Sequence, residues 1–216
     1  MRNRIILFDL DGTLIDSTQA VFESFCHSFK TLGEKEPSFN AVSSQIGHTL
    51  EDMFQTLGAK NENLQKHIDV YKEHYRQICN AKTQLLTHAK EAILKAHTFA
   101  TLGVVTTKTG KYSKLLLEHF DVLQYFACVV GREDVTYAKP DKEPILKALE
   151  LINIPLQKNQ IFMIGDTPLD ILAASNAGVN SIGVLSGYAS KETLEKYTNT
   201  LAKDALEAVC MIERDL

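Results

Sequence analysis

The chain has 216 residues, of which 44% are hydrophobic and 23% charged, so it can bury a core of useful size without disulfides or a structural metal. Its net charge is −4 and its basic residues are scattered, which argues against a nucleic-acid-binding protein. The first apolar run is far too short for a signal peptide or a membrane span. Four cysteines form no CxxC pair and predict free thiols in a reducing compartment: Cys26, Cys79, Cys128 and Cys210. We therefore expect a cytoplasmic protein with neither nucleic-acid nor membrane partners.

Short apolar runs predict the strands of a parallel sheet. Because they are apolar on both faces, they are typical of a sheet that helices cover on both sides. The runs are Ile5–Phe8, Leu102–Val105, Ala127–Val130, Ile161–Ile164 and Ser181–Leu185. Helical patterns separate the later runs, at Tyr112–His119, Lys142–Leu151 and Leu169–Ala177. This order predicts an α/β fold with a doubly wound, mainly parallel, Rossmann-like sheet.

The stretch between the first two predicted strands is too long for a plain crossover helix. Residues 17–98 contain no convincing strand run and instead predict amphipathic helices. One carries a stripe from Phe22 to Phe29, and the next two cover Val42–Leu57 and Leu64–Cys79. We predict a small helical cap at residues 17–81, inserted into a catalytic core formed by residues 1–16 and 82–216. The tail from residue 190 predicts two further helices.

Charged and hydroxyl side chains follow the ends of the predicted strands. The carboxyl edge of an open α/β sheet is where such folds bind ligands, so we expect these side chains to share one site. They are Asp9 and Asp11 after the first strand, Thr106, Thr107 and Lys108 after the second, Lys139 after the third, and Asp166 and Asp170 after the fourth.

These residue types suit phosphoryl transfer. Two carboxylates as close as Asp9 and Asp11 repel each other unless a cation lies between them or one is protonated. Mg²⁺ binds one or two carboxylates together with substrate phosphate oxygens, and Asp166 could supply a further carboxylate. Aspartate is a covalent nucleophile in phosphoryl transfer, and a second carboxyl group can act as general acid and base. Thr106 and Lys139 offer a hydroxyl and a positive charge to the phosphoryl oxygens.

The run Phe8-Asp9-Leu10-Asp11-Gly12-Thr13, with Leu14–Ser17 after it, resembles the first signature of the haloacid dehalogenase superfamily. Thr106, Lys139 and Gly165–Asp170 resemble its second, third and fourth signatures, in the right order. The resemblance implies a Mg²⁺ cofactor and a role for each matching residue. Asp9 would be nucleophile and metal ligand, and Asp11 would be the acid and base, with its backbone carbonyl on the metal. Thr106 and Lys139 would bind phosphate, Asp166 would bind the metal, and Asp170 would support the metal or Lys139.

Within that superfamily the chain most resembles phosphoglycolate phosphatases. Ile46-Gly47-His48-Thr49-Leu50 is similar to the substrate loop of their cap, which adds Gly47 to Thr107 and Lys108 as predicted substrate contacts. Thr107 stands where an asparagine is common. Leu86-Thr87-His88-Ala89 stands in place of a Tyr-Pro-Gly-Val turn, which changes the predicted hinge of the cap.

We therefore predict a Mg²⁺-dependent hydrolase of a small phosphorylated metabolite, a phosphomonoester such as phosphoglycolate, that acts through an aspartyl-phosphate on Asp9. Alternative hypotheses are a pyrophosphatase, a sugar-phosphate phosphomutase and a non-catalytic phosphate-binding module. A carbon–halogen hydrolase is a further alternative, against which Asp11 argues because that reaction needs no acid for an alkoxide. The sequence does not decide between a monomer and a homodimer.

Overall fold

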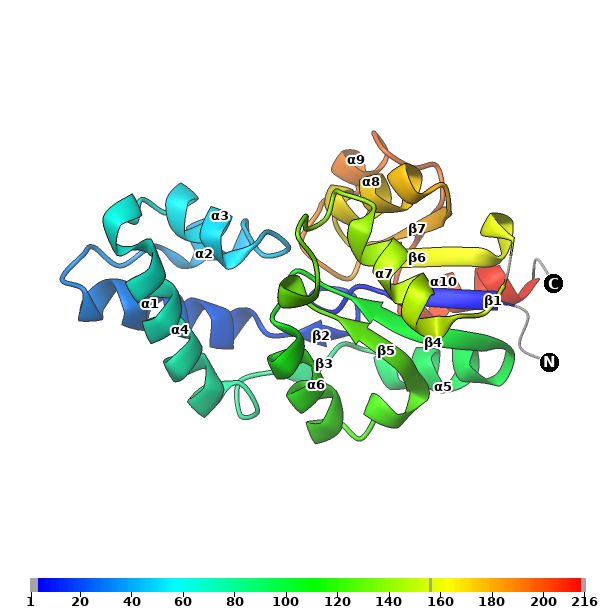
Figure 1. The fold of residues 1–216 in the computed structure, drawn as a ribbon, viewed down its shortest axis with the longest axis horizontal. Coiled ribbons are helices and arrows are strands. Elements are labelled where there is room, and N and C mark those ends of the chain that lie inside the picture. The colour runs from blue at the N-terminus through cyan, green and yellow to red at the C-terminus, as the bar shows by residue number, and fades with distance from the viewer. Residues whose placement is uncertain (1–3, 156, 215–216) are drawn as a thin grey trace.

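The computed structural model describes residues 4–155 and 157–214, in which a sheet flanked by helices lies beside a separate cluster of helices (Figure 1). The larger sheet has six strands in the order β5-β4-β1-β6-β7-β8, and all of its pairings are parallel. Its strands are β1 Arg4–Phe8, β4 Ala100–Val105, β5 Phe126–Val130, β6 Ile161–Gly165, β7 Asn180–Val184 and β8 Leu201–Ala202. The predicted doubly wound parallel fold is confirmed.

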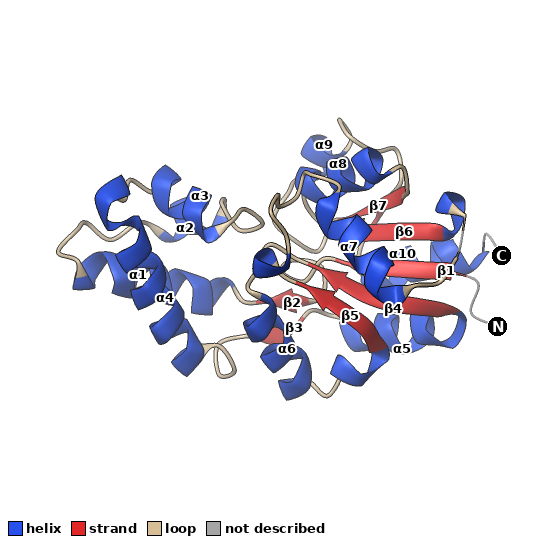
Figure 2. Ribbon diagram, in the orientation of Figure 1, coloured by secondary structure: helices blue, strands red, loops and turns tan. Residues whose placement is uncertain are grey.

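Helices cover both faces of this sheet (Figure 2). They are α5 Ala89–Phe99, α6 Gly110–His119, α7 Glu143–Ile152, α8 Pro168–Ala177, α9 Lys191–Leu194 and α10 Ala205–Arg214. Successive side chains of a strand point to opposite faces, so β1 serves two cores. Ile5 and Leu7 are buried in the core that includes residues of α7 and α8. Ile6 and Phe8 are buried in the core that includes residues of α5 and α10.

The remaining α-helices, which come between β1 and β4 in the chain, form the separate cluster. They are α1 Thr18–Thr31, α2 Phe39–Ser43, α3 Leu50–Thr56 and α4 Leu64–Ile78. Aromatic rings hold the cluster together: the Phe25 ring centre lies 4.4 Å from that of Phe54 and 4.9 Å from that of Tyr71. We call this cluster the cap. Its predicted limits at residues 17 and 81 stay a prediction.

Two predictions about the region around the cap are wrong. The helix expected over Val42–Leu57 is divided into α2 and α3, because Gly47 has a φ of +106° and Thr49 starts a new helix by accepting a hydrogen bond from the amide of Asp52. The region expected to lack strands contains β3, Gln84–Leu85, which pairs antiparallel with β2, Ile15–Asp16. These two strands are the two connections between the sheet and the cap, and we call them the hinge strands.

The tail also differs from its prediction. Between the two expected helices, α9 and α10, lies β8, which adds a sixth parallel strand beside β7. Strands of two residues are too short to show any periodicity, so β2, β3 and β8 left no pattern to detect. All four cysteines are free thiols, as predicted. Within the described residues, no helix is both long enough and apolar enough to cross a membrane; the cytoplasmic location stays a prediction.

The segment Leu86–Ala89, which stands in place of the Tyr-Pro-Gly-Val turn, keeps at His88 the backbone geometry that a glycine would favour. His88 immediately precedes α5 and has a φ of +62°, in the left-handed region that costs an L-residue about 1–2 kcal/mol. Its Nδ1 lies 2.9 Å from Oδ2 of Asp204, whose Oδ1 accepts the amide of Glu207 at the start of α10. A hydrogen bond to the residue just before α10 thus holds His88 in a strained conformation.

Replacing His88 tests this account with a matched pair of variants. His88→Ala and His88→Gly both lose the contact with Asp204, but only glycine relieves the left-handed strain. We expect His88→Gly to exceed His88→Ala in free energy of unfolding by about 1 kcal/mol, measured by urea denaturation. Equal stabilities, or a more stable alanine variant, would show that the φ of residue 88 stores no strain.

Candidate active site

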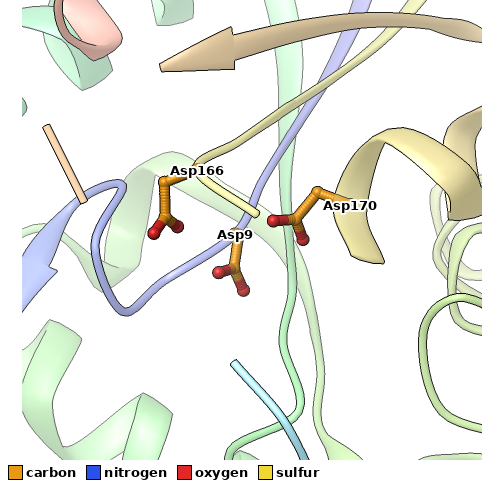
Figure 3. Close-up of side chains that lie close together, drawn as sticks. All are labelled: Asp9, Asp166 and Asp170. Atoms are coloured by element: carbon orange, nitrogen blue, oxygen red, sulfur yellow. The ribbon is translucent and has the colours of Figure 1, made fainter. Parts of the chain in front are cut away.

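The predicted site residues meet at the carboxyl ends of the central strands. Asp9 directly follows β1, Asp166 directly follows β6, and Lys139 lies in the connection between β5 and α7. Figure 3 shows the carboxyl groups of Asp9, Asp166 and Asp170 close together. Each of the three contributes an oxygen that lies within 4.8 Å of the others, and all three side chains are buried. The structure therefore brings these predicted residues together, and their roles stay predictions.

Lys139 joins two of these carboxylates. Its Nζ donates to Oδ1 of Asp9 at 2.7 Å, to Oδ1 of Asp170 at 2.5 Å and to the backbone oxygen of Val105 at 3.0 Å. Burial opposes the charged form of Lys139, but Asp170 and Asp9 outweigh that effect and raise its pKa above the ordinary value. Lys139 is thus a fixed positive charge with all three ammonium hydrogens engaged.

Asp170 lies in the first turn of α8 and has hydrogen-bond donors on both oxygens. Its Oδ2 accepts from the amide and the hydroxyl of Thr167, at 3.0 and 2.7 Å, which caps the helix. Its Oδ1 accepts from Lys139. The capping contact fixes the carboxylate, and the carboxylate in turn orients the lysine.

Asp166 is enclosed by backbone. Its Oδ1 accepts the hydroxyl of Thr13 at 3.1 Å, and its Oδ2 accepts the amide of Tyr188 at 2.9 Å. A Cβ atom on Gly12 would lie 2.3 Å from Oδ2, and one on Gly187 would lie 2.0 Å from it. Only glycine permits so close an approach, and Gly12 also has a φ of +81°. The carboxylate is therefore held in one orientation.

The three buried carboxylates carry more negative charge than the one ammonium group balances. Burial raises the pKa of Asp9 to about 7, although Lys139 works against this. Burial, followed by the charges of Asp9 and Asp170, raises the pKa of Asp166 well above its usual range. No hydrogen bond reaches Oδ2 of Asp9 from the described part of the chain. Because the donors are hard carboxylate oxygens with unbalanced charge, the residues present fit a divalent cation of the Mg²⁺ type.

Asp11 lies outside this group of carboxylates and forms a second charged pair. Its Oδ2 lies 3.1 Å from Nζ of Lys108, and its Oδ1 accepts the hydroxyl of Ser17. Only about a tenth of either charged side chain is exposed, 9% for Asp11 and 10% for Lys108. The Lys108 Nζ also lies 4.7 Å from the ring centre of Tyr75 in the cap, a cation–π contact. This pair therefore marks the boundary between core and cap.

The remaining predicted residues lie at the same boundary. The buried Thr106 hydroxyl accepts the amide of Lys108 at 3.1 Å and so shapes the loop after β4. The Thr107 hydroxyl donates to the backbone oxygen of Gly47 at 2.9 Å, which joins that loop to the cap. Thr107 thus makes a contact between core and cap.

A small cavity of about 40 Å³ lies between the cap and the core. Asp11, Lys108, Thr107 and Thr109 line its core side. The cap side is largely apolar and includes Val21, Ile46, Gly47, Leu50, Met53, Tyr71 and Tyr75. A volume of this size holds only a few water molecules. Any group that reaches Asp11 through this cavity must be small.

Sequence reasoning missed several partners of the site residues. Thr13 belongs to the same run as Asp9, so its place in that motif was a usable signal for its contact with Asp166. Tyr188 contributes a backbone amide, which every residue except proline carries, so no residue pattern pointed to it. The contacts of Ser17 and Tyr75 depend on how the cap packs against the core.

Comparisons with known proteins agree with this geometry. The chain matches the haloacid dehalogenase-like hydrolase family over residues 6–184. It is 32% identical to the pyrophosphatase PpaX of Anoxybacillus flavithermus, with 91% of this chain and 90% of that protein covered. It is also 32% identical to a phosphoglycolate phosphatase of Aquifex aeolicus, with 86% of each covered. A solved structure of a haloacid dehalogenase-like family hydrolase from Streptococcus pneumoniae superposes with a TM-score of 0.86 at 25% identity, covering 96% of this chain and 97% of that one.

The raised pKa of Asp9 predicts a pH dependence of stability in the metal-free protein. Between the ordinary value of 3.8 and about 7, the folded chain keeps a proton on Asp9 that the unfolded chain has lost. The stability from this group is therefore complete below about pH 4 and is lost as the pH rises through about 7, by at most about 1.4 kcal/mol per pH unit.

Urea denaturation of the wild type and of Asp9→Asn, from pH 4 to pH 8 in a chelator, measures this loss. We expect the free energy of unfolding of the wild type to fall relative to the variant as the pH rises. Millimolar Mg²⁺ should reduce the fall, because the cation binds the ionised carboxylate. Parallel pH curves for the two proteins would refute the assignment of the raised pKa to Asp9.

Proposed function

Because the chain belongs to the haloacid dehalogenase-like hydrolases and is a phosphatase of that family, we propose that it hydrolyses a small phosphomonoester with Mg²⁺, through an aspartyl-phosphate on Asp9. One observation carries the proposal. The Asp9 carboxylate lies at the end of a central strand with Lys139 on its Oδ1 and with Asp166 close by, while no donor among the described residues reaches its Oδ2. That oxygen is available to attack phosphorus.

The proposed first step transfers the phosphoryl group to the protein. An oxygen of Asp9 forms a bond to phosphorus while the bond from phosphorus to the leaving oxygen breaks. Asp11, the next acidic residue along the chain, gives its proton to that oxygen, so the leaving group departs with a neutral hydroxyl group. The position of Asp11 beside the cavity supports this role, because the cavity is where the leaving group would lie.

The proposed second step restores the protein. Asp11, now ionised, takes a proton from a water molecule, whose oxygen attacks the phosphorus of the aspartyl-phosphate. The bond between Asp9 and phosphorus breaks and inorganic phosphate leaves. Asp11 ends protonated and Asp9 ends as a carboxylate, so the cycle closes.

Charge balance is the main task of the other residues. We propose that Asp9 and Asp166 hold Mg²⁺ together with the backbone carbonyl of Asp11. The cation would offset the repulsion between the carboxylate nucleophile and the anionic phosphate. Lys139 and Thr106 would contact the transferring phosphoryl oxygens. Asp170 already has Lys139 and Thr167 on its oxygens, so we propose that it positions Lys139 and lies beside the metal rather than displacing those contacts to bind it.

The cavity favours a small organic leaving group. Its cap side is mostly apolar, and two lysines line the cavity: Lys108 beside Asp11, and Lys72 on the cap side. A two-carbon acid such as the glycolate of phosphoglycolate has both the apolar atoms and the carboxylate to suit such a wall. We propose that Gly47, Thr107 and Lys108 border this group. A hexose would need the cap to move, which disfavours a sugar-phosphate phosphomutase.

Pyrophosphate is the second candidate substrate. The resemblance to a pyrophosphatase extends over nine-tenths of the chain, at the same identity as the resemblance to a phosphoglycolate phosphatase. Phosphate as a leaving group is as small as glycolate but has no apolar surface. We rank it second because the apolar wall of the cavity would add nothing to its binding.

Phosphate release by the purified protein tests both candidates. With millimolar Mg²⁺ we expect turnover of phosphoglycolate to exceed that of pyrophosphate, and both to exceed that of hexose phosphates and nucleotides. Asp9→Asn keeps the shape of the side chain but removes the nucleophile, so we expect at least a 10³-fold loss of kcat. Beryllium fluoride should add to the wild type at Asp9 and should not add to this variant.

Each outcome of this panel is informative. Release by the wild type that does not exceed release by Asp9→Asn would end the proposal of catalysis and leave a phosphate-binding module. Preference for pyrophosphate would reverse the ranking of the substrates. Isomerisation of a hexose phosphate with little free phosphate would identify a phosphomutase.

A further inference from the structure

Tyr188 contacts both the metal-binding edge of the core and the start of the cap. It lies in the loop after β7 and is half-buried. Its backbone amide donates to Oδ2 of Asp166 at 2.9 Å. Its phenol oxygen lies 3.0 Å from Oγ1 of Thr18, the first residue of α1. One residue therefore spans the distance between a proposed metal ligand and the first turn of the cap.

The hydrogen bonds of Thr18 fix the direction of this contact. The Thr18 hydroxyl donates to Oδ1 of Asp16 at 2.6 Å, and the Thr18 amide donates to the same oxygen at 2.9 Å. A hydroxyl group has only one hydrogen to donate, so the Tyr188 phenol must be the donor to Thr18. The chain of hydrogen bonds runs from Tyr188 to Thr18 to Asp16. Asp16 thus binds the first amide of α1, one residue before the N-cap position that Ser17 occupies.

This chain of hydrogen bonds ends on the hinge strands. Asp16 belongs to β2 and is paired with Gln84 of β3. The amide of Leu86, just beyond β3, donates to the backbone oxygen of Leu14 just before β2, at 3.0 Å. Both connections between the sheet and the cap therefore pass through this small sheet. A contact that fixes Asp16 and Thr18 fixes the cap where it leaves the core.

The surroundings keep the Tyr188 phenol protonated. Burial, and after it the negative charge of Asp11, raise the pKa of Tyr188 above its ordinary value, with smaller effects from Asp16 and Asp166. The neutral phenol is the form that can donate to Thr18, in agreement with the hydrogen-bond geometry. An ionised phenol would lose the contact with Thr18, because Thr18 gives its only hydroxyl hydrogen to Asp16.

We propose that Tyr188 is a positioning residue. Through Thr18 and Asp16 it holds the hinge strands and the cap in a fixed position relative to the Asp166 carboxylate. The proposal deepens the proposed function and rests on it, because the position of the cap relative to the core matters only where the cap closes on a substrate held at Asp9 and Asp166. The cap side of the cavity then meets the substrate in one orientation. Loss of the phenol contact should weaken substrate binding and leave the bond-forming residues in place.

Tyr188→Phe removes the hydroxyl and keeps the amide that binds Asp166. Thr18→Val removes the other partner in nearly the same shape, and Thr18→Ser is the matched control because it keeps the hydroxyl. One hydrogen bond of this kind corresponds to about a 3- to 10-fold effect. We expect Tyr188→Phe and Thr18→Val each to raise KM by about that factor with kcat within twofold, and Thr18→Ser to behave as the wild type. The double variant should be no worse than either single one.

Hydrogen exchange provides a readout that does not depend on turnover. We expect the amides of residues 15–18 and 84–86 to exchange about 3- to 10-fold faster in Tyr188→Phe and in Thr18→Val. If the wild type releases no phosphate from any substrate, the proposed function fails while exchange still decides on the positioning role. Unchanged exchange in Tyr188→Phe would overturn the proposal. The proposal would also be overturned if the effects of the two single variants multiplied in the double variant, because a general loss of packing would act independently at the two positions.

Discussion

The structure depends on how it keeps three carboxylates together in a buried site. Removing one charge from water is costly unless a partner and hydrogen bonds replace the lost hydration. Lys139 supplies one positive charge, shared by Asp9 and Asp170. Thr13, Thr167 and the amide of Tyr188 supply the hydrogen bonds for the other oxygens. When all three carboxylates are ionised, Lys139 balances one negative charge and two are left, which is the physical reason to expect a divalent cation beside Asp9.

The parallel sheet places these groups together. β1 lies between β4 and β6, and its register pairs Phe8 with Val104 on one side and with Ile164 on the other. The residues that follow these positions leave the sheet at one edge, which brings Asp9 next to the segment that carries Asp166. The two residues are far apart in the chain, and only the crossover connections of a parallel sheet make them neighbours.

Those features of the structure that depend on residue type and spacing could be predicted from the sequence. The five longer strands of the sheet were predictable because both of their faces are apolar. The placement of Asp9, Asp166 and Lys139 close together was predictable because each follows the end of one of these strands. The two-residue strands β2, β3 and β8 have no period. The break between α2 and α3 depends on one positive φ at Gly47 and one cap at Thr49. The amide of Tyr188 is invisible in a sequence, because its role follows from where the backbone lies.

In the proposed mechanism, the core performs the catalysis and the cap selects the leaving group. The core provides the carboxylates of Asp9, Asp166 and Asp170, whereas the cap side of the cavity is mostly apolar and places the Tyr75 ring over Lys108. Substitutions in the cap can therefore change the leaving group that fits without altering the charge balance at Asp9. For the same reason, relatives with a similar core can have names that refer to different small phosphate compounds, such as pyrophosphate and phosphoglycolate. The hinge strands are the covalent connections between the two parts, and together with contacts such as that of Thr107 with Gly47 they set the position of the cap walls relative to the core.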